Sequence, residues 1–370
     1  MMVKSIDEIE TVLRLKLILL SGYSIGIKKG LLEFCENKKL SLARVINKDN
    51  IYSFPWIFIR LNPSMRVRLV VDQISPNFYI ELSDQNKDLY AIVDNFTNHT
   101  IVTNLELEYA MHHCPQQLFY NLHQYCFMKC GFCPLTIAPQ WNNESLEKIF
   151  SDIDKFEGQN IHGIGLTSGI PAHESGNKVA WEMVRIVEAL RIKIGNNIPI
   201  GVSPLQPSED VIWALKNAKA NEIRINIEVN NPVLARIISP RKNPEKTLES
   251  ISNAVKIFGH GKVSSNIILG VGETNNEVIE GIEELAKNGA IATLSPYDDF
   301  PEGNKFLSEI QKTAPFSLEG RNFGRPKPDR LLLLAQEHKR ILENHSLNPL
   351  LLKTMCPHCT ATNIMPGRDL

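Results

Sequence analysis

The chain has 370 residues, 43% of them hydrophobic, and this length favours one large domain with a smaller appendage. Its 40 Lys and Arg residues balance 41 Asp and Glu residues, leaving a formal charge of −1. Because phosphate-backbone binding requires an excess of positive charge, this balance argues against a nucleic-acid partner. No apolar run approaches the roughly 18 residues of a membrane span, so we expect no membrane association.

The N-terminal sequence carries acids before a short apolar stretch, which indicates an ordinary helix rather than a signal peptide. Seven cysteines are few for a disulfide scaffold, and five of them form two tight clusters. Clustered cysteines indicate metal binding in a reducing compartment, so we expect a cytoplasmic protein.

Residues 1–115 predict a small α+β domain, because an opening helix is followed by short alternating or β-branched runs. This region contains no cluster of reactive side chains, so we interpret it as a structural lid or extension, with Cys35 as a small core residue. The predicted elements are a helix at Ile6–Leu20 and strands at Tyr52–Leu61, Arg66–Val71, Asn77–Leu82 and Leu89–Val93.

Residues 116–330 alternate short strands with amphipathic helices, which is typical of repeated βα units on a parallel sheet. The strands are expected at Leu118–Asn121, Gly163–Thr167, Ile198–Val202, Glu222–Glu228, Lys262–Leu269 and Ala290–Ser295. The helices are expected at Ser145–Lys155, Lys178–Lys193, Pro207–Ala218, Pro244–Phe258 and Glu277–Asn288. Six such units predict an α/β fold of the partial (βα)6 TIM-barrel type, with its chemistry on the loops after the strands.

The remaining chain is expected to cover and complete this barrel. Asp298–Arg330 is rich in Pro, Gly and charge, and predicts a long loop over the barrel mouth. Residues 331–370 predict a C-terminal helix at Leu331–Asn344 and a cysteine-containing tail packed on the barrel. In that tail, Leu350–Lys353 is expected to run as a strand that brings Cys356 and Cys359 towards the mouth.

The decisive motif is a three-cysteine loop after the first barrel strand, with Cys126, Cys130 and Cys133 in the spacing C-x3-C-x2-C. Cysteine thiolates are standard ligands of iron–sulfur clusters, and three of them leave the fourth iron of a [4Fe–4S] cube without a protein ligand. The alternatives are a zinc site with a fourth ligand nearby, or three unrelated core cysteines.

This spacing, with aromatic Phe132 just before the last cysteine, resembles the signature of the radical S-adenosylmethionine (radical SAM) superfamily. The resemblance implies that the open iron binds S-adenosylmethionine, which the cluster cleaves reductively to a 5′-deoxyadenosyl radical. It places Phe132 near the adenine. Within the superfamily the chain is similar to biotin synthase, methylornithine synthase and hydrogenase-cofactor maturases, and above all to a biotin synthase-related group.

Three further segments extend the resemblance to the binding of S-adenosylmethionine. Thr167, Ser168 and Gly169 occupy the place of a Gly-Gly-Glu motif that meets the methionine amino group, although they lack its carboxylate and Glu174 follows only later. Asn226 and Glu228 would face the ribose and substrate, and Arg241 the methionine carboxylate. Gly270, in Gly270-Val271-Gly272, would stack along the adenine. Ordinary turns and solvated charges remain the alternatives for these individual side chains.

The second cysteine cluster, Cys356 and Cys359, can supply half of a tetrahedral site and suggests an auxiliary cluster or metal. The other ligands would be His358, or His112, His113 and Cys114 before the first barrel strand, although the latter are expected at the opposite barrel end. The alternative is a pair of reduced cysteines in a terminal loop. No cysteine lies between Cys133 and Cys356, which argues against sulfur insertion by the biotin synthase route.

The resemblance implies an enzyme that abstracts hydrogen from a small organic substrate, leading to rearrangement, carbon–carbon bond formation or methylation. Its cofactors would be a [4Fe–4S] cluster and S-adenosylmethionine, and its reductant ferredoxin or flavodoxin. The acids and bases expected near the substrate are Glu228, Arg236, Asp298, Asp299 and Arg325. Two alternatives are a non-catalytic iron–sulfur electron-transfer protein and a radical enzyme that modifies a peptide or protein.

Overall fold

The structure is a computed structural model of the 370-residue chain. It describes residues 10–27, 45–47, 50–52, 56–61, 65–70, 75–83, 89–108, 115–133, 135, 145–156, 161–298, 301–313 and 318–370. Cys35, His112, His113, Cys114 and Asp299 lie outside these ranges.

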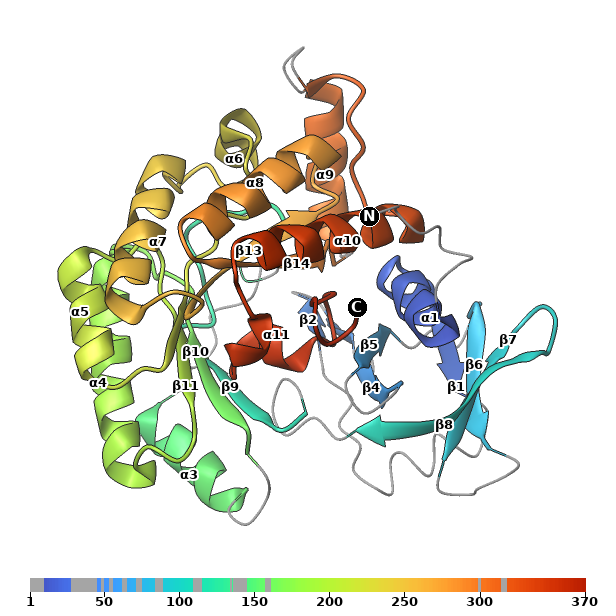
Figure 1. Ribbon diagram of the computed structural model, residues 1–370, viewed down its shortest axis with the longest axis horizontal. Coiled ribbons are helices and arrows are strands. Elements are labelled where there is room, and N and C mark those ends of the chain that lie inside the picture. The colour runs from blue at the N-terminus through green and yellow to red at the C-terminus, as the bar shows by residue number, and fades with distance from the viewer. Residues whose placement is uncertain are drawn as a thin grey trace.

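The larger part of the fold is a six-stranded parallel sheet that curls into a partial barrel (Figure 1). Its strands follow one another in chain order, and the helices between them cover the outer face. The strands are β9 (Gln117–Asn121), β10 (Gly163–Thr167), β11 (Ile200–Ser203), β12 (Glu222–Arg224), β13 (Val263–Leu269) and β14 (Ile291–Pro296). The connecting helices are α3 (Leu146–Lys155), α4 (Gly176–Ile194), α5 (Glu209–Asn217), α6 (Pro232–Ile238), α7 (Pro244–Phe258) and α8 (Asn275–Lys287). The predicted fold class is confirmed.

Local sequence signals account for these elements. All seven residues of β13 are buried, as expected for a central strand of a parallel sheet. Side-chain oxygens of Ser145, Ser175 and Asn243 accept hydrogen bonds at the starts of α3, α4 and α7. Helix α8 begins with a capping box between Thr274 and Glu277. Helix α6 was not predicted; Pro232 begins it, after the Asn231 cap.

The N-terminal part forms a second six-stranded sheet in the order β1-β6-β7-β8-β4-β5. Four of its strands match predicted ones: β4 (Trp56–Arg60), β5 (Arg66–Val70), β6 (Phe78–Leu82) and β7 (Tyr90–Asp94). The structure adds β1 (Ile25–Ile27), β8 (Thr100–Glu108) and the separate hairpin β2 (Val45–Asn47) and β3 (Asn50–Tyr52). Helix α1 (Thr11–Leu20) packs against β5, β8 and α10 (Pro328–Asn344).

Two predictions about the C-terminal third are wrong. The stretch Asp298–Arg330 is not a continuous loop, because it contains the helix α9 (Pro301–Thr313). Leu350–Lys353 is not a strand: Pro349 begins the short 3-10 helix η4 (Pro349–Leu351), and α11 (Met355–Cys359) follows it. Helix α11 contacts β9 and β10, and Lys353 lies against Gly163 at the amino end of β10. The tail therefore enters the barrel from the end opposite its mouth.

The tail also joins the two sheets across the open side of the barrel (Figure 1). Ile364 pairs with Leu294 of β14, and the Arg68 N–H of β5 donates to the Ala361 carbonyl at 2.8 Å. The Lys16 ammonium of α1 donates to Asp369 Oδ1 and to the Thr360 carbonyl, each at 2.8 Å, with both charged side chains fully buried. Burial lowers the pKa of Lys16 and raises that of Asp369.

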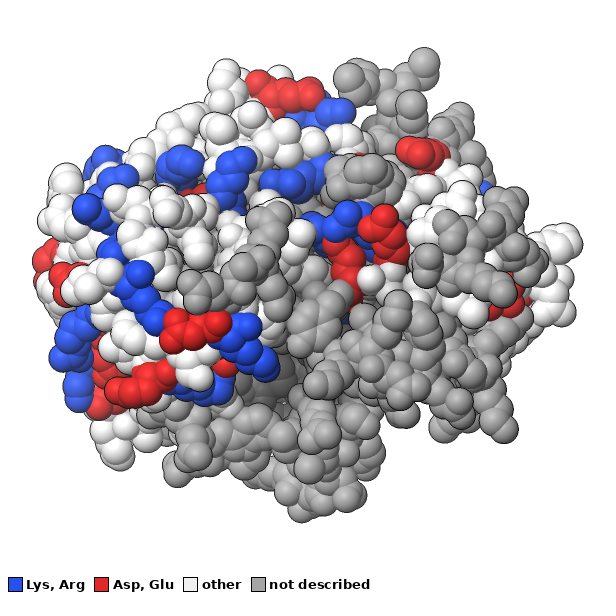
Figure 2. Space-filling view, turned by 90° about the horizontal axis from the view of Figure 1, so that it is seen from below, with Lys and Arg blue, Asp and Glu red and all other residues white. Residues whose placement is uncertain are grey.

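Lysine and arginine side chains are interspersed with acidic ones on the barrel surface seen from below, as Figure 2 shows. Among the described residues, no helix is both long enough and apolar enough to cross a membrane.

His338 lies on the buried face of α10, and neither imidazole nitrogen has a hydrogen-bond partner among the described residues. Burial lowers the pKa of this side chain to about 3. Because the unfolded chain has the ordinary histidine pKa of about 6.5, it binds an extra proton between these two values. The free energy of unfolding therefore falls as pH drops through this window.

We expect this free energy to be about 2 kcal/mol lower at pH 5 than at pH 7 through His338 alone. His338→Leu should reduce the dependence of the free energy of unfolding on pH. The exposed His99 provides the control, because His99→Gln should keep the wild-type dependence. Urea denaturation at the two pH values measures the difference. Equal slopes for wild type and His338→Leu would contradict the assignment.

Candidate functional site

The three-cysteine loop follows β9 and lies at the carboxyl end of the barrel strands. Three backbone or sulfur hydrogen bonds attach it to its neighbours. The Phe127 N–H donates to the Ile170 carbonyl at 2.7 Å, and the Ile170 N–H donates to Cys126 Sγ at 3.4 Å. The Gly131 N–H donates to the carbonyl of Ile238 in α6 at 2.9 Å. The loop is thus bound both to the turn after β10 and to the segment after β12.

Gly169 is where the two strand-end turns meet most closely. Its N–H donates to the His123 carbonyl at 2.9 Å and to Asn121 Oδ1 at 3.1 Å. A Cβ at this position would lie 2.3 Å from the Tyr125 carbonyl oxygen and 2.7 Å from that of His123. Only glycine fits there, because both neighbours are backbone atoms that carry the cysteine loop.

The cysteine sulfurs share one environment. Burial raises the pKa of Cys133 to about 12, and the negative charges of Cys130, Cys126 and Glu228 act in the same direction. Burial also raises the pKa of Cys130, against the lowering influence of Ser239 and Lys242. A thiol in such a place ionises when it binds a metal, because the ligand is the thiolate.

The donor set fits an iron–sulfur cube better than a single ion. Among the described residues, no three His, Cys, Asp or Glu side chains are close enough to bind one metal ion, as a zinc site would require. In a [4Fe–4S] cube each cysteine binds a different iron, so the three side chains need not converge on one ion. The N–H bond to Cys126 Sγ is of the kind that tunes cluster sulfurs.

Asn226 and Glu228 follow β12, and both contact the ammonium group of Lys242. Lys242 Nζ donates to the Asn226 carbonyl at 2.8 Å and lies 3.1 Å from Glu228 Oε1. Glu228 is buried and adopts a positive φ of 67°, a strained conformation that surrounding contacts such as the ion pair with Lys242 must stabilise. Lys242 was not among the predicted site residues, although it directly follows Arg241.

Arg241 lies on the outer surface of the cysteine loop. Its guanidinium stacks over the Phe127 ring, 3.5 Å from the centroid, and donates to the Phe127 carbonyl at 3.0 Å. Its predicted contact with the methionine carboxylate stays a prediction.

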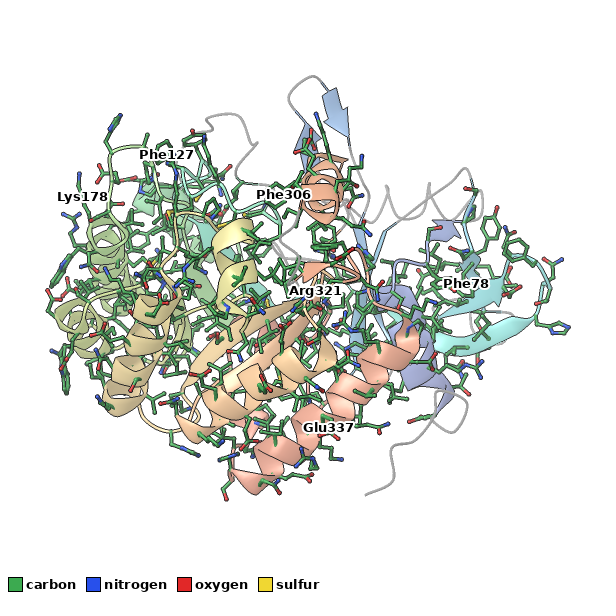
Figure 3. The ribbon with its side chains drawn as sticks, turned by 90° about the horizontal axis from the view of Figure 1, so that it is seen from above. Phe78, Phe127, Lys178, Phe306, Arg321 and Glu337 are labelled. Carbon is green, nitrogen blue, oxygen red and sulfur yellow. The ribbon has the colours of Figure 1, made fainter. Side chains whose placement is uncertain are left out.

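Phe132 belongs to an apolar cluster beside the loop that also includes Ile238 and Val271. Phe306 of α9 joins this cluster, and its ring occupies the space that a side chain at Gly131 would need, since a Cβ there would lie 1.9 Å away. Figure 3 shows Phe306 projecting from the helix that rises beside the barrel mouth. The structure therefore brings Phe132 and Val271 into one apolar cluster, and the predicted contacts of Phe132 and Gly270 with the adenine stay predictions.

The polar groups of the other predicted segments already have protein partners. Ser168 Oγ accepts from the His123 N–H at 3.2 Å and donates to the Gly169 carbonyl at 2.7 Å. Thr167, the last residue of β10, is half-buried. Glu174 pairs with Lys178 at 2.6 Å on the first turn of α4.

The glycine-rich end of β13 is covered from the other side by residues after α9. The Gly324 N–H donates to the Gly270 carbonyl at 2.7 Å, and Phe323 occupies the space beside Gly272. The Gly270 and Val271 N–H groups donate to the Glu273 carboxylate at 2.8 and 2.9 Å. Burial raises the pKa of Glu273, while Arg330 opposes that shift.

Few of the remaining predicted polar residues approach the loop. Arg236 pairs with Glu245 at an exposed position, 2.6 Å apart. Asp298 binds Arg68 and Arg325 at the open side of the barrel, where all three line a cavity of about 240 Å³. His123, three residues before Cys126, pairs its Nε2 with Glu182 of α4 at 2.7 Å.

Residues 120–285 match the radical SAM superfamily. The chain is 27% identical over 194 residues to lipoyl synthase of Treponema denticola, covering 50% of this chain and 62% of that protein. It is 26% identical over 188 residues to lipoyl synthase of Histophilus somni, covering 48% and 56%. It thus spans less than two thirds of these relatives. A structure of methylornithine synthase is 16% identical with a TM-score of 0.46, covering 63% of this chain and 69% of that one. The maturase HydG of Carboxydothermus hydrogenoformans is 16% identical with a TM-score of 0.46, covering 62% of this chain and 52% of that one.

The partial barrel and its cysteine loop thus define an iron–sulfur barrel domain that is open at the carboxyl end of its strands. Residues 120–285 are a radical SAM domain, and the predicted superfamily is confirmed. The cofactors of this superfamily are a [4Fe–4S] cluster and S-adenosylmethionine, and Cys126, Cys130 and Cys133 are the residues that would hold the cluster.

Gly169→Ala should displace the cysteine loop, because the new methyl group overlaps two of its carbonyl oxygens. We expect the free energy of unfolding to fall by about 1–3 kcal/mol through local distortion of the loop. We also expect less iron per chain after anaerobic reconstitution. The control is Gly281→Ala in α8, where the nearest atom is the Asn230 side chain at 3.0 Å. Wild-type iron content in Gly169→Ala would show that the loop tolerates this shift.

Proposed function

We propose that this chain is a radical SAM enzyme that abstracts a hydrogen atom from a small organic substrate, leading to rearrangement, carbon–carbon bond formation or methylation. The observation that carries the proposal is the convergence of three cysteines, Glu228 and Lys242 at the carboxyl end of the barrel. When bound, the cluster and S-adenosylmethionine supply the 5′-deoxyadenosyl radical.

The polar residues after β12 suit the binding of the nucleoside and amino-acid groups. Glu228 accepts hydrogen bonds, and its pairing with Lys242 fixes the carboxylate before any ligand enters. The Lys242 ammonium, which also binds the Asn226 carbonyl, can meet a ligand carboxylate beside Cys130. We propose this role for Lys242 together with Arg241.

The apolar cluster of Phe132, Val271 and Phe306 excludes water from one side of the site. A short-lived radical needs such exclusion, because side reactions compete with transfer to the substrate. Thr167, Ser168, Gly169 and Gly270 would line the remaining walls, and their internal hydrogen bonds hold those walls rigid. The 27% identity to a lipoyl synthase covers half the chain and supports the class of chemistry rather than a substrate.

We infer the reductant and the cellular location from the same chemistry. A reductant such as ferredoxin or flavodoxin would supply the electron, and a cytoplasmic location would keep cluster and thiols reduced.

The class of reaction is tested by anaerobic incubation of cluster-loaded protein with S-adenosylmethionine and dithionite. We expect methionine and 5′-deoxyadenosine, measured by liquid chromatography. Cys130→Ala should form neither product, whereas Lys193→Ala, which removes an ion pair with Asp154 on the outer surface, should form both. A fully loaded wild-type cluster that forms no 5′-deoxyadenosine would overturn the proposal.

Glu228→Gln tests the binding role separately. Removal of one charge-assisted hydrogen bond should weaken the binding of S-adenosylmethionine by about tenfold, as measured by equilibrium dialysis with cluster-loaded protein. Glu245→Gln is the matched control, because that carboxylate pairs with Arg236 at the surface. Unchanged affinity in Glu228→Gln would remove this residue from the binding site.

A further inference from the structure

We propose that Cys356 and Cys359 form a redox-active dithiol at the closed end of the barrel, with Cys356 as the reactive thiol. The pair would interconvert with a disulfide by exchange with a small-molecule disulfide. This site is separate from the cysteine loop, and the inference does not depend on the proposed radical chemistry.

The segment that carries the pair is built into the floor of the barrel. The Glu222 carboxylate accepts from the backbone N–H groups of Lys353 and Thr354 and from the Thr354 hydroxyl, at 2.7–3.1 Å. Gln117 Oε1 accepts from the Met355 N–H at 2.7 Å. Because Glu222 and Gln117 begin β12 and β9, these bonds fix the segment across the amino ends of the strands.

Glycines on the neighbouring strands make room for this segment inside the barrel. A Cβ at Gly201 of β11 would lie 2.1 Å from Thr354 Oγ1, and one at Gly165 of β10 would lie 3.3 Å from Met355 Cγ. Alternate residues of a strand face the same side of a sheet. Gly165 therefore shares its face with Thr167, and Gly201 shares its face with Ser203. Thr354 and Met355 therefore pack directly against the backbone of β10 and β11.

Cys356 continues this segment towards the carboxyl end of β12. Arg224 Nη1 donates to Cys356 Sγ at 3.0 Å, and Arg224 Nε donates to Asn226 Oδ1 at 2.9 Å. Arg224 ends β12 and pairs in the sheet with Ser264 of β13. A single guanidinium therefore links the Cys356 sulfur to a residue of the proposed nucleoside site.

Each of the two sulfurs has at least one cation nearby. Arg224 contacts Cys356, and Cys359 lies within electrostatic reach of Lys16 and Arg368, whose cationic forms it favours. Thiol–disulfide exchange places negative charge on the attacking and leaving sulfurs, and neighbouring cations stabilise that charge.

The two sulfurs are also placed to react with each other. Residues three positions apart lie on one face of a helical turn, about 5–6 Å between Cβ atoms, and a disulfide requires only a modest approach. Both cysteines line the same small cavity, together with Phe119 of β9 and Arg68 of β5. Cys356 is half-buried and Cys359 is buried, so an incoming disulfide meets Cys356 first.

The contacts of the neighbouring histidine favour a dithiol over a metal site. His358 Nε2 faces His162 Nδ1 at 3.2 Å, and Arg368 lies against His358 Nδ1 at 3.3 Å. Both ring nitrogens of His358 therefore already have protein partners.

The proposed exchange has two steps. The Cys356 thiolate attacks one sulfur of the small disulfide, forms a mixed disulfide and releases one thiol. The Cys359 thiolate then attacks the Cys356 sulfur and releases the second thiol. Two protein thiols are oxidised to one disulfide, and the small disulfide is reduced to two thiols that take up the two protons.

The test is mass spectrometry of cluster-loaded protein equilibrated anaerobically with reduced and oxidised glutathione. Trypsin cuts after Lys353 and Arg368, so both cysteines fall in one peptide, Thr354–Arg368, with no cysteine of the cluster loop. We expect this peptide to lose two hydrogens under oxidising ratios and to regain them with excess reduced glutathione. Cys359→Ser should stop at the mixed disulfide on Cys356, whereas Cys356→Ser should take up much less glutathione.

Two results would overturn the proposal. One is a peptide that stays fully reduced, or that carries glutathione on each cysteine without an internal disulfide, at every ratio. The other is iron or zinc retained at one atom per chain or more by reconstituted Cys126→Ala protein but lost on further substitution of Cys356 and Cys359 by serine, which would make the pair a metal site.

The role of Arg224 is tested in protein that retains both Cys356 and Cys359. Arg224→Leu should slow the alkylation of Cys356 by iodoacetamide about tenfold, because the guanidinium no longer stabilises charge on the sulfur. Arg185→Leu, on the exposed face of α4, is the control and should leave the rate unchanged. An equal rate in Arg224→Leu and wild type would contradict the assignment of Cys356 as the activated thiol.

Discussion

The attachment of the cysteine loop to the end of β10 is the constraint on which the rest of the site depends. A loop with three metal ligands needs a fixed path, and the hydrogen bonds of Phe127 and Gly169 to the neighbouring strand turn supply it. The contact between Gly131 and Ile238 then fixes the loop relative to α6 and, through it, to Lys242 and Glu228. The cysteine loop and the Lys242–Glu228 pair, for which we propose a role in cofactor binding, are thereby held in fixed positions relative to each other.

Most of the barrel could be predicted from the sequence, because its strands are short apolar runs separated by amphipathic helices with clear capping residues. The boundaries of β10 and α7 agree with the prediction, and the other strands shift by a few residues. The cysteine motif was equally informative, since its spacing is local and does not depend on tertiary contacts. Adjacent cations were harder to distinguish: Arg241 and Lys242 differ by one position, yet only Lys242 turns towards Glu228.

The C-terminal part could not be predicted in the same way, because its conformation is set by residues far away in the chain. Thr354 and Met355 follow the path allowed by Gly165 and Gly201, and those glycines carry no local signal that a distant segment will fill their space. Leu350–Lys353 is apolar enough for a strand, but Pro349 begins a 3-10 helix instead, and Lys353 then donates to the distant Glu222 carboxylate. The tail therefore approaches the barrel from the floor, contrary to the prediction.

The buried ion pair between Lys16 and Asp369 joins positions 353 residues apart. During synthesis, the α1 ammonium emerges from the ribosome long before its carboxylate partner does. Until residue 369 has been added, α1 carries a cation that has no buried counter-ion from this pair, and complete closure of the barrel floor must wait. Long-range contacts of this kind slow folding. Until the tail has been added, the amino ends of the barrel strands lack the segment that covers them.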